Sequence, residues 1–284
     1  MSTRTVAIIT LLIAVSLCSG CAEKTSEQQS GPEKFVVIVS ILPQVDFVEH
    51  VGGDTVKVIE MIPPGANPAT YEPTASQLKM VSNAKMYAKV GSGLPFEDVW
   101  LDKIRAANPE MLIVDTSEGV DLIPGDPHIW LSPRCAMVQV ENIYRGLVKV
   151  DPENERHYYQ NKEQYLHDLE ELDVGINESL SGFSNRTFMV FHPSWGYYAR
   201  DYNLKMIAFE SEGKEPSLSD MEYIIEIAKE KNIHFIFVQP QFSTRSAEVI
   251  AKDIGCTVIF LDPLAKDYIT NMHEVTENIT QSLA

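Results

Sequence analysis

The 284-residue sequence is short of basic side chains: 23 lysines and arginines stand against 40 aspartates and glutamates, a formal net charge of −17. Nucleic-acid binders neutralise phosphates with clustered positive charge, so this balance argues against nucleic acid as a partner. The chain has only 15 glycines and 16 prolines beside 44% hydrophobic residues, which excludes a disordered or collagen-like protein. At this length we expect two domains.

Several motifs of common enzymes are also missing. The sequence contains no Walker-type glycine loop, no His-Glu-x-x-His run and no nucleophile elbow. ATP hydrolysis and two frequent classes of hydrolase therefore have no support in the sequence. After the N-terminus, no apolar stretch approaches the length of a membrane span.

The first 34 residues have the composition of an export and tethering segment. Residues 6–17 form a twelve-residue apolar run behind a single charge, Arg4, which predicts a signal peptide over residues 1–20. The run ends in Leu17-Cys18-Ser19-Gly20-Cys21, which resembles a lipobox. We expect cleavage before Cys21 and its lipidation, with plain signal cleavage as the alternative. Residues 21–34 are polar and predict a lipid-anchored flexible tether. The chain is then exported, to the outer face of the cytoplasmic membrane or the periplasm.

From Phe35 onward, short apolar runs alternate with helix-length segments. The first series of runs covers residues 35–40, 56–62, 86–90 and 111–114, and the second covers 187–191, 205–209, 234–238 and 257–261. Strands separated by helix-length segments are typical of parallel sheets covered by helices. We therefore predict an α/β fold with an N-terminal lobe over 35–150 and a C-terminal lobe over 182–284.

A single long helix is predicted to join the two lobes over residues 151–181. Asp151 is placed to cap it, Pro152 suits its first position, and Gly182 is placed to end it. One face of this helix is apolar, which indicates a continuous, rigid helix packed along that face. The apolar positions are Tyr158, Tyr165, Leu169, Leu172, Ile176 and Leu180.

The residues that follow the predicted strands suggest a binding site. In parallel sheets, the loops that leave the carboxyl ends of the strands build the site. His192 and Asp262 each come directly after a strand, and His128 ends the loop that leaves the strand at 111–114. Two imidazoles and a carboxylate are a plausible ligand set for a borderline metal such as zinc.

Five segments carry a resemblance to a known family. They are PPGANPATYEPTASQL at 63–78, DPHIWLSP at 126–133, FHPSWGYYARDYNL at 191–204, VQPQFS at 238–243 and LDPL at 261–264. Together they resemble the zinc/manganese class of ABC-transporter solute-binding proteins (ZnuA/TroA-type), over residues 35–283. The resemblance implies two lobes on a helical spine. It also implies a monomeric protein, not an enzyme, that carries Zn²⁺ or Mn²⁺ to an ABC permease with a cytoplasmic ATPase.

The same resemblance implies four metal ligands, of which three match. His128, His192 and Asp262 stand at ligand positions, whereas the family's remaining histidine position is occupied by Ala69. Three outcomes are open: water completes the site, Glu72 on the same loop swings in, or the site no longer works. We favour water in the gap. A histidine at position 192 favours zinc, since manganese-type members have glutamate there. The sequence lacks the His-rich acidic loop of many zinc-type members.

Aromatic residues near the site, Trp130, Trp195 and Tyr197, are expected to wall the cleft and orient the ligands. Two other functions stay open. The first is a surface binding protein of this fold that has lost metal transport and binds another solute or partner, an interpretation motivated by Ala69. The second is a zinc hydrolase with an open His₂Asp site and Glu72 as base.

Overall fold

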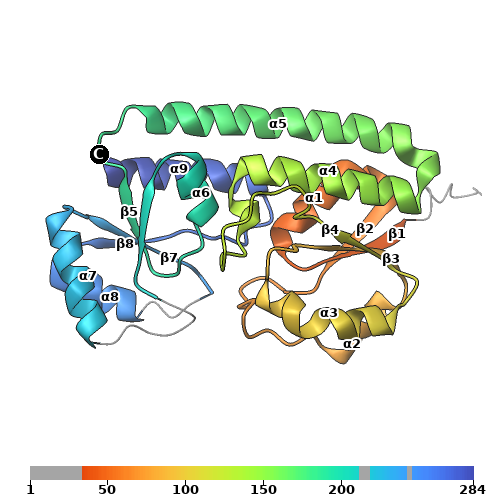
Figure 1. Ribbon diagram of the computed structural model, residues 1–284, viewed down its shortest axis with the longest axis horizontal. Helices are drawn as coiled ribbons and strands as arrows, with labels where there is room; N and C mark the ends of the chain where they lie inside the picture. The colour runs from red at the N-terminus through yellow and green to blue at the C-terminus, as the bar shows by residue number, and fades with distance from the viewer. Residues whose placement is uncertain (1–33, 211–217, 242–244) are drawn as a thin grey trace, which may run out of the picture. The chain divides into compact units, whose positions relative to one another are not determined.

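The computed structural model describes residues 34–210, 218–241 and 245–284. The expected signal peptide, the lipidation site Cys21 and almost all of the tether lie outside these residues. The described part contains two parallel four-stranded sheets with helices packed around them (Figure 1). The predicted α/β fold with two lobes and one long helix is therefore confirmed. None of the described helices is both long and apolar enough to cross a membrane.

The first lobe is built on a sheet of order β2-β1-β3-β4, and the second on a sheet of order β6-β5-β7-β8. The strands are β1 (Phe35–Val39), β2 (Val56–Glu60), β3 (Ala84–Lys89), β4 (Leu112–Asp115), β5 (Thr187–Val190), β6 (Lys205–Ala208), β7 (Phe235–Val238) and β8 (Thr257–Phe260). All eight predicted strands are present, with ends that differ from the predictions by at most two residues.

Helices fill the intervals between the strands, together with three short 3₁₀ turns. In the first lobe they are α1 (Leu42–Gly52), α2 (Ala75–Val81), α3 (Pro95–Ala107) and α4 (Pro133–Val150), with turns at Gly53–Thr55 and Ile129–Leu131. The turn Pro152–Asn154 leads into α5 (Glu155–Ser181). In the second lobe they are α6 (Gly196–Asp201), α7 (Leu218–Glu230), α8 (Arg245–Ile254) and α9 (Tyr268–Leu283).

The strands form where the sequence is apolar on both faces. In β1 the side chains of Val37, Ile38 and Val39 are fully buried, as expected for a central strand covered by helices on both sides. β1 pairs in parallel with β2, Phe35 opposite Val56, and with β3 on its other side. All of the β-ladders are parallel, so the carboxyl ends of the strands in each sheet meet at one edge.

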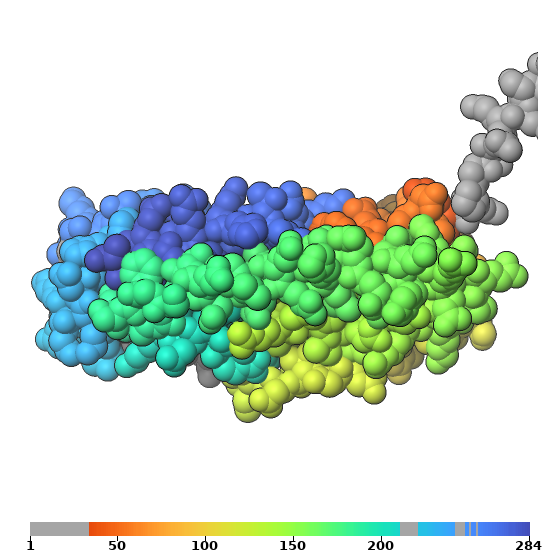
Figure 2. All heavy atoms as spheres, turned by 90° about the horizontal axis from the view of Figure 1, so that it is seen from above, coloured from red at the N-terminus to blue at the C-terminus, as the bar shows by residue number. Residues whose placement is uncertain are grey.

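The long helix α5 packs against both lobes. It contacts α1 and α4 of the first lobe and α9 of the second (Figure 1). In Figure 2 it is the green band of side chains that lies beside the blue α9. Every side chain of the predicted apolar face is buried, and the helix ends at Ser181, directly before Gly182. The stripe was therefore predicted correctly.

The start of this helix differs from the prediction. Asp151 does not cap α5: the turn Pro152–Asn154 intervenes, and α5 begins at Glu155. The Asp151 carboxylate instead accepts hydrogen bonds from the Tyr158 hydroxyl, at 2.5 Å, and from the Asn154 side-chain amide, at 2.8 Å. The Asp151 carboxylate thus accepts from the buried Tyr158 hydroxyl and not from a backbone N–H at the start of α5.

A lysine on the apolar face of α5 was not expected. Lys162 is only 6% exposed, and its ammonium lies 3.0 Å from Glu141 Oε2 on α4 and 2.7 Å from Glu163 Oε1. The same ammonium lies 4.9 Å from the ring centroids of both Tyr144 and Tyr159. Its charge is therefore paired, which makes its burial tolerable and ties α5 to α4.

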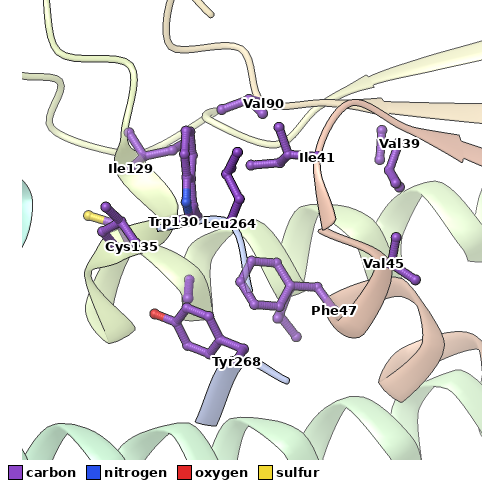
Figure 3. Close-up of a cluster of buried hydrophobic side chains, with 14 of the residues drawn as sticks. Val39, Ile41, Val45, Phe47, Val90, Ile129, Trp130, Cys135, Leu264 and Tyr268 are labelled. Atoms are coloured by element: carbon purple, nitrogen blue, oxygen red, sulfur yellow. The ribbon is translucent and has the colours of Figure 1, made fainter. Parts of the chain in front are cut away.

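One hydrophobic core extends through both lobes. Its buried residues come from the first sheet, from α1, α4 and α5, and from β5, α6 and α9 of the second lobe. Figure 3 shows Leu264 and Tyr268, which precede and begin α9, among first-lobe side chains such as Phe47. The Phe47 and Tyr268 ring centroids are 5.0 Å apart, in an edge-to-face arrangement. A separate, smaller core lies under α7 and α8.

Polar contacts cross between the lobes beside this core. The indole Nε1 of Trp130 donates to the carbonyl oxygen of Pro263 at 2.7 Å. The hydroxyl of Ser132, at the start of α4, donates to the carboxylate of Asp201, at the end of α6. Apolar packing and hydrogen bonds thus both join the two lobes, which form one compact unit over residues 34–284.

The buried face of α5 gives the first testable prediction. Replacing the fully buried Leu169 with alanine should lower the free energy of unfolding by about 2–5 kcal/mol, because it leaves a cavity in the shared core. The control is Glu170→Ala, an exposed change on the same helix, which should stay within about 0.5 kcal/mol of the wild type. Urea unfolding measures both. Equal effects of the two changes would contradict the assigned burial.

Candidate functional site

A cavity of about 450 Å³ lies where the loops of both sheets meet. Its lining comes from segments that follow the carboxyl ends of six strands, as expected for parallel sheets. After β2, β3 and β4 these are Asn67, Pro68, Ala69, Thr70, Leu94, Pro95, Gly125, Pro127, His128 and Trp130. After β5, β7 and β8 they are His192, Pro193, Gln239, Gln241, Pro263 and Leu264.

His128 is held in the cavity wall by Asp126. The carboxylate oxygen Oδ1 of Asp126 accepts from the backbone N–H of His128 at 2.9 Å and from its ring Nδ1 at 2.7 Å. This contact selects the tautomer with the proton on Nδ1 and the lone pair on Nε2. Burial lowers the pKa of His128 below its ordinary 6.5, and the hydrogen bond that its ring donates to Asp126 opposes that shift.

His192 has a matching carboxylate partner that sequence reasoning missed. Its Nδ1 is in close contact with Oε2 of Glu210, whose residue is only 4% exposed. Glu210 lies two residues beyond the end of β6, the neighbour of β5 in the sheet. Its position after a strand was therefore a signal that could have found it. As with Asp126, the carboxylate places the proton of the imidazole on Nδ1.

The two imidazoles meet across the cavity. The ring centroids of His128 and His192 lie 5.3 Å apart, with an interplanar angle of 79°. One ring comes from the first lobe and the other from the second. Each has its Nδ1 against a carboxylate, so the Nε2 atoms carry the lone pairs. Two neutral imidazoles that converge in this way can act as a pair of nitrogen ligands for a cation.

Asp262 is close to the cavity but does not line it. Its Oδ1 accepts hydrogen bonds from Nε2 of Gln241 at 2.8 Å and from the backbone N–H of Leu264 at 2.9 Å. Within the described ranges, no three His, Cys, Asp or Glu side chains are gathered closely enough to hold a metal ion. The structure thus brings two of the three expected ligands together, and the full ligand set stays a prediction.

Ala69 lines the cavity on the first-lobe side. It sits in a tight turn in which its N–H donates to Oδ1 of Asn67 at 2.8 Å, while the Asn67 carbonyl accepts from the N–H groups of Thr70 and Tyr71. Glu72 is exposed and is not among the described residues that line the cavity. The expected position of the missing ligand therefore faces the site, whereas the proposed auxiliary ligand does not.

The three aromatic residues play different parts. Trp130 lines the cavity, and its ring centroid is 5.2 Å from that of His128. The Tyr197 hydroxyl donates to the carbonyl oxygen of Asp126 at 3.1 Å and accepts from the N–H of Ile123 at 2.8 Å, so it braces the loop that carries His128. Trp195 is buried against Tyr198 and does not line the cavity.

A glycine permits the close approach of the second lobe to Asp126. A Cβ added to Gly196, the first residue of α6, would lie 2.2 Å from Oδ2 of Asp126. Real side chains do not tolerate such a distance, so a larger residue here would displace the carboxylate that holds His128. The position of this imidazole therefore depends on residues of both lobes.

The burial of His128 gives a pH prediction for the metal-free protein. Its imidazole should titrate below pH 6.5, and Asp126→Asn should lower the pKa further because the carboxylate favours the protonated ring. Since the pKa is lower in the folded than in the unfolded chain, folding stability from this group is complete above pH 6.5. It is lost as the pH falls from 6.5 toward the folded-state pKa. NMR titration of the ring measures this. A pKa above 6.5, or one raised by Asp126→Asn, would contradict it.

Comparison with known proteins identifies the family. The model of the family described as "Zinc-uptake complex component A periplasmic" (ZnuA) matches residues 37–282. The high-affinity zinc uptake system protein ZnuA of Bacillus subtilis is 26% identical over 280 residues, which cover 90% of this chain and 86% of that protein.

Solved structures agree with this assignment. A crystal structure of ZnuA superposes with a TM-score of 0.86 and 41% sequence identity, covering 89% of this chain and all of that one. The Zn(II)-bound ZnuA-like domain of Streptococcus pneumoniae AdcA has a TM-score of 0.76 and 26% identity, over 88% of this chain and 99% of that one. The chain therefore belongs to the ZnuA family of periplasmic components of zinc-uptake complexes.

Proposed function

We propose that this chain is the extracytoplasmic solute-binding protein of an ABC transporter, and that it captures zinc in the cavity and delivers it to a membrane permease. The observation that carries the proposal is the pair of imidazoles, His128 and His192, that face each other with a carboxylate behind each ring. Imidazole favours zinc over the harder manganese ion, which is the alternative cargo. Membership of a family of zinc-uptake components supports the same assignment.

In this proposal the ion is bound by His128, His192 and Asp262, with water where Ala69 leaves a gap. Oδ1 of Asp262 accepts the hydrogen bonds from Gln241 and Leu264, so Oδ2 is the carboxylate oxygen that has to reach the ion. The neighbouring residue Pro263 already lines the cavity, so a local change in one loop is sufficient. Zinc accommodates three protein ligands and a water.

The same proposal states where the protein works and with which partners. The chain is exported, is held at the membrane by a lipid on Cys21, and works as a monomer beside a permease with a cytoplasmic ATPase. The family is a component of an uptake complex, and we propose that this member is likewise a carrier and performs no catalysis.

Zinc titration of the purified, metal-free protein tests the proposal. The wild type should bind one zinc ion with micromolar or lower Kd, and His192→Ala should weaken binding by at least about 100-fold because it removes a ligand. His167→Ala, an exposed change on α5, is the matched control and should leave the Kd unchanged. If the wild type fails to bind at micromolar zinc, this member of the family has lost metal binding. The alternative function, a binding protein for a different solute or partner, then replaces this proposal.

The gap at Ala69 gives a second, opposite test. Ala69→His should tighten zinc binding by about tenfold or more, since an imidazole on this turn replaces the water. Glu72→Gln should leave the affinity of the wild type unchanged, because the exposed Glu72 is not a ligand when water fills the gap. Calorimetry reports both. No gain from the added histidine would show that the proposed geometry is wrong, and a loss on Glu72→Gln would favour the auxiliary ligand.

A further inference from the structure

Within the part of the chain that the structure describes, two amide oxygens beside the imidazoles are buried without a hydrogen-bond donor. They are Oε1 of Gln239 and Oε1 of Gln241, on the segment that follows β7. Gln239 is only 3% exposed, and both residues line the cavity that His128 and His192 share. A buried carbonyl oxygen with no donor is destabilising, so two such atoms in one cavity wall need an explanation.

The neighbours of each side chain fix which end is the oxygen. The amide nitrogen of Gln241 faces Oδ1 of Asp262, and a carboxylate oxygen can only accept. The amide nitrogen of Gln239 faces the carbonyl oxygen of His192 at 3.4 Å and the hydroxyl of Ser194 at 2.5 Å. Turning the Gln241 amide round would place two acceptors against each other. Turning the Gln239 amide round would place its oxygen against the His192 carbonyl oxygen, although the Ser194 hydroxyl could then donate to it. The two oxygens are therefore the ends left without a donor.

Among the described residues that line the cavity, few have groups that could donate to these oxygens. Five of the residues that line the cavity are prolines, which have no backbone N–H. The imidazoles hold their protons on Nδ1, toward Asp126 and Glu210. The donors for these oxygens therefore come from what fills the cavity, and water is the simplest such donor. A bare zinc ion has none, but a zinc-bound water has two strongly polarised O–H groups.

We propose that the ion is bound with a water molecule retained, and that Gln239 and Gln241 hold this water by accepting its two O–H groups. The inference rests on the proposed function and adds two residues to it. Each glutamine is one hydrogen bond away from a proposed ligand, Gln239 from the His192 carbonyl and Gln241 from the Asp262 carboxylate. The two acceptors thus lie on the second-lobe side of the cavity, while Ala69 lines it on the first-lobe side.

This arrangement has a consequence for selectivity. The two glutamine oxygens favour a neutral water as the last ligand of the ion, because water can donate a proton to each of them. An anion in the same place has no proton to donate and is repelled by the two carbonyl oxygens. The wild-type site should therefore resist small anions such as azide, which bind to many open metal sites. The glutamines act through the water and are positioning residues for it.

Substitutions that keep the shape of glutamine test the assignment. Gln239→Met and Gln241→Met should each weaken zinc binding by about 10–100-fold, the usual effect of losing a partner of a metal ligand. Gln239→Glu keeps an oxygen toward the water, and the Ser194 hydroxyl can turn to donate to the carboxylate oxygen that replaces the amide nitrogen. This variant should bind zinc within about threefold of the wild type, a rescue that a purely structural role would not produce. The midpoint of thermal unfolding of each metal-free variant shows whether it is folded, and the zinc-induced shift of that midpoint provides a second measure of affinity.

The absorption spectrum of the cobalt(II)-loaded protein reads out the retained water directly. Azide should leave the wild-type spectrum unchanged and alter the spectra of the two methionine variants. The inference is overturned if both methionine variants bind zinc as the wild type does, if Gln239→Glu fails like Gln239→Met, or if azide affects all of the proteins alike or none. A wild type that binds no metal would overturn the proposed function itself, which is a distinct result.

Discussion

The hydrophobic core that runs through both lobes is the constraint on which the site depends. Trp130 stands at the junction: it is buried in that core, its indole N–H is bonded to Pro263 of the other lobe, and its ring lies beside His128. The loops that carry the two imidazoles therefore start from elements that are packed into the same core. A pair of rings 5.3 Å apart, supplied by two separate sheets, requires this kind of fixed frame.

A carboxylate behind the imidazole ring is a feature that both lobes share. Asp126 and Glu210 each place a carboxylate against Nδ1, although they come from a loop after β4 and from the end of β6. The same physical solution, a buried acid that selects the tautomer and orients the ring, is thus reached by different local structures. Tyr197 and Gly196 of α6 extend this support to Asp126, since one braces its carbonyl and the other leaves room for its carboxylate.

The sequence was sufficient for the strands, the long helix and the two imidazoles, because periodicity and strand ends are local properties. Pairings between distant segments were not accessible. Glu210 reaches His192 only because β6 lies beside β5. Lys162 is tolerated in an apolar stripe because Glu141 of α4 lies opposite, in addition to Glu163 of its own helix. Asp151 has the residue type and position of a helix N-cap, but its carboxylate accepts a hydrogen bond from the Tyr158 hydroxyl instead. In each case a tertiary partner decided the role, and the sequence does not reveal which segments become neighbours.

The placement of Leu264 and Tyr268 also bears on how the chain is made. These residues, next to the last helix, complete the core around Phe47 of the first lobe. While the polypeptide is being synthesised or translocated from its N-terminus, the first lobe lacks part of its core until the final segment has emerged. Contacts so distant in sequence form late and slowly. Completion of the N-terminal core thus depends on α9 and on the residues just before it.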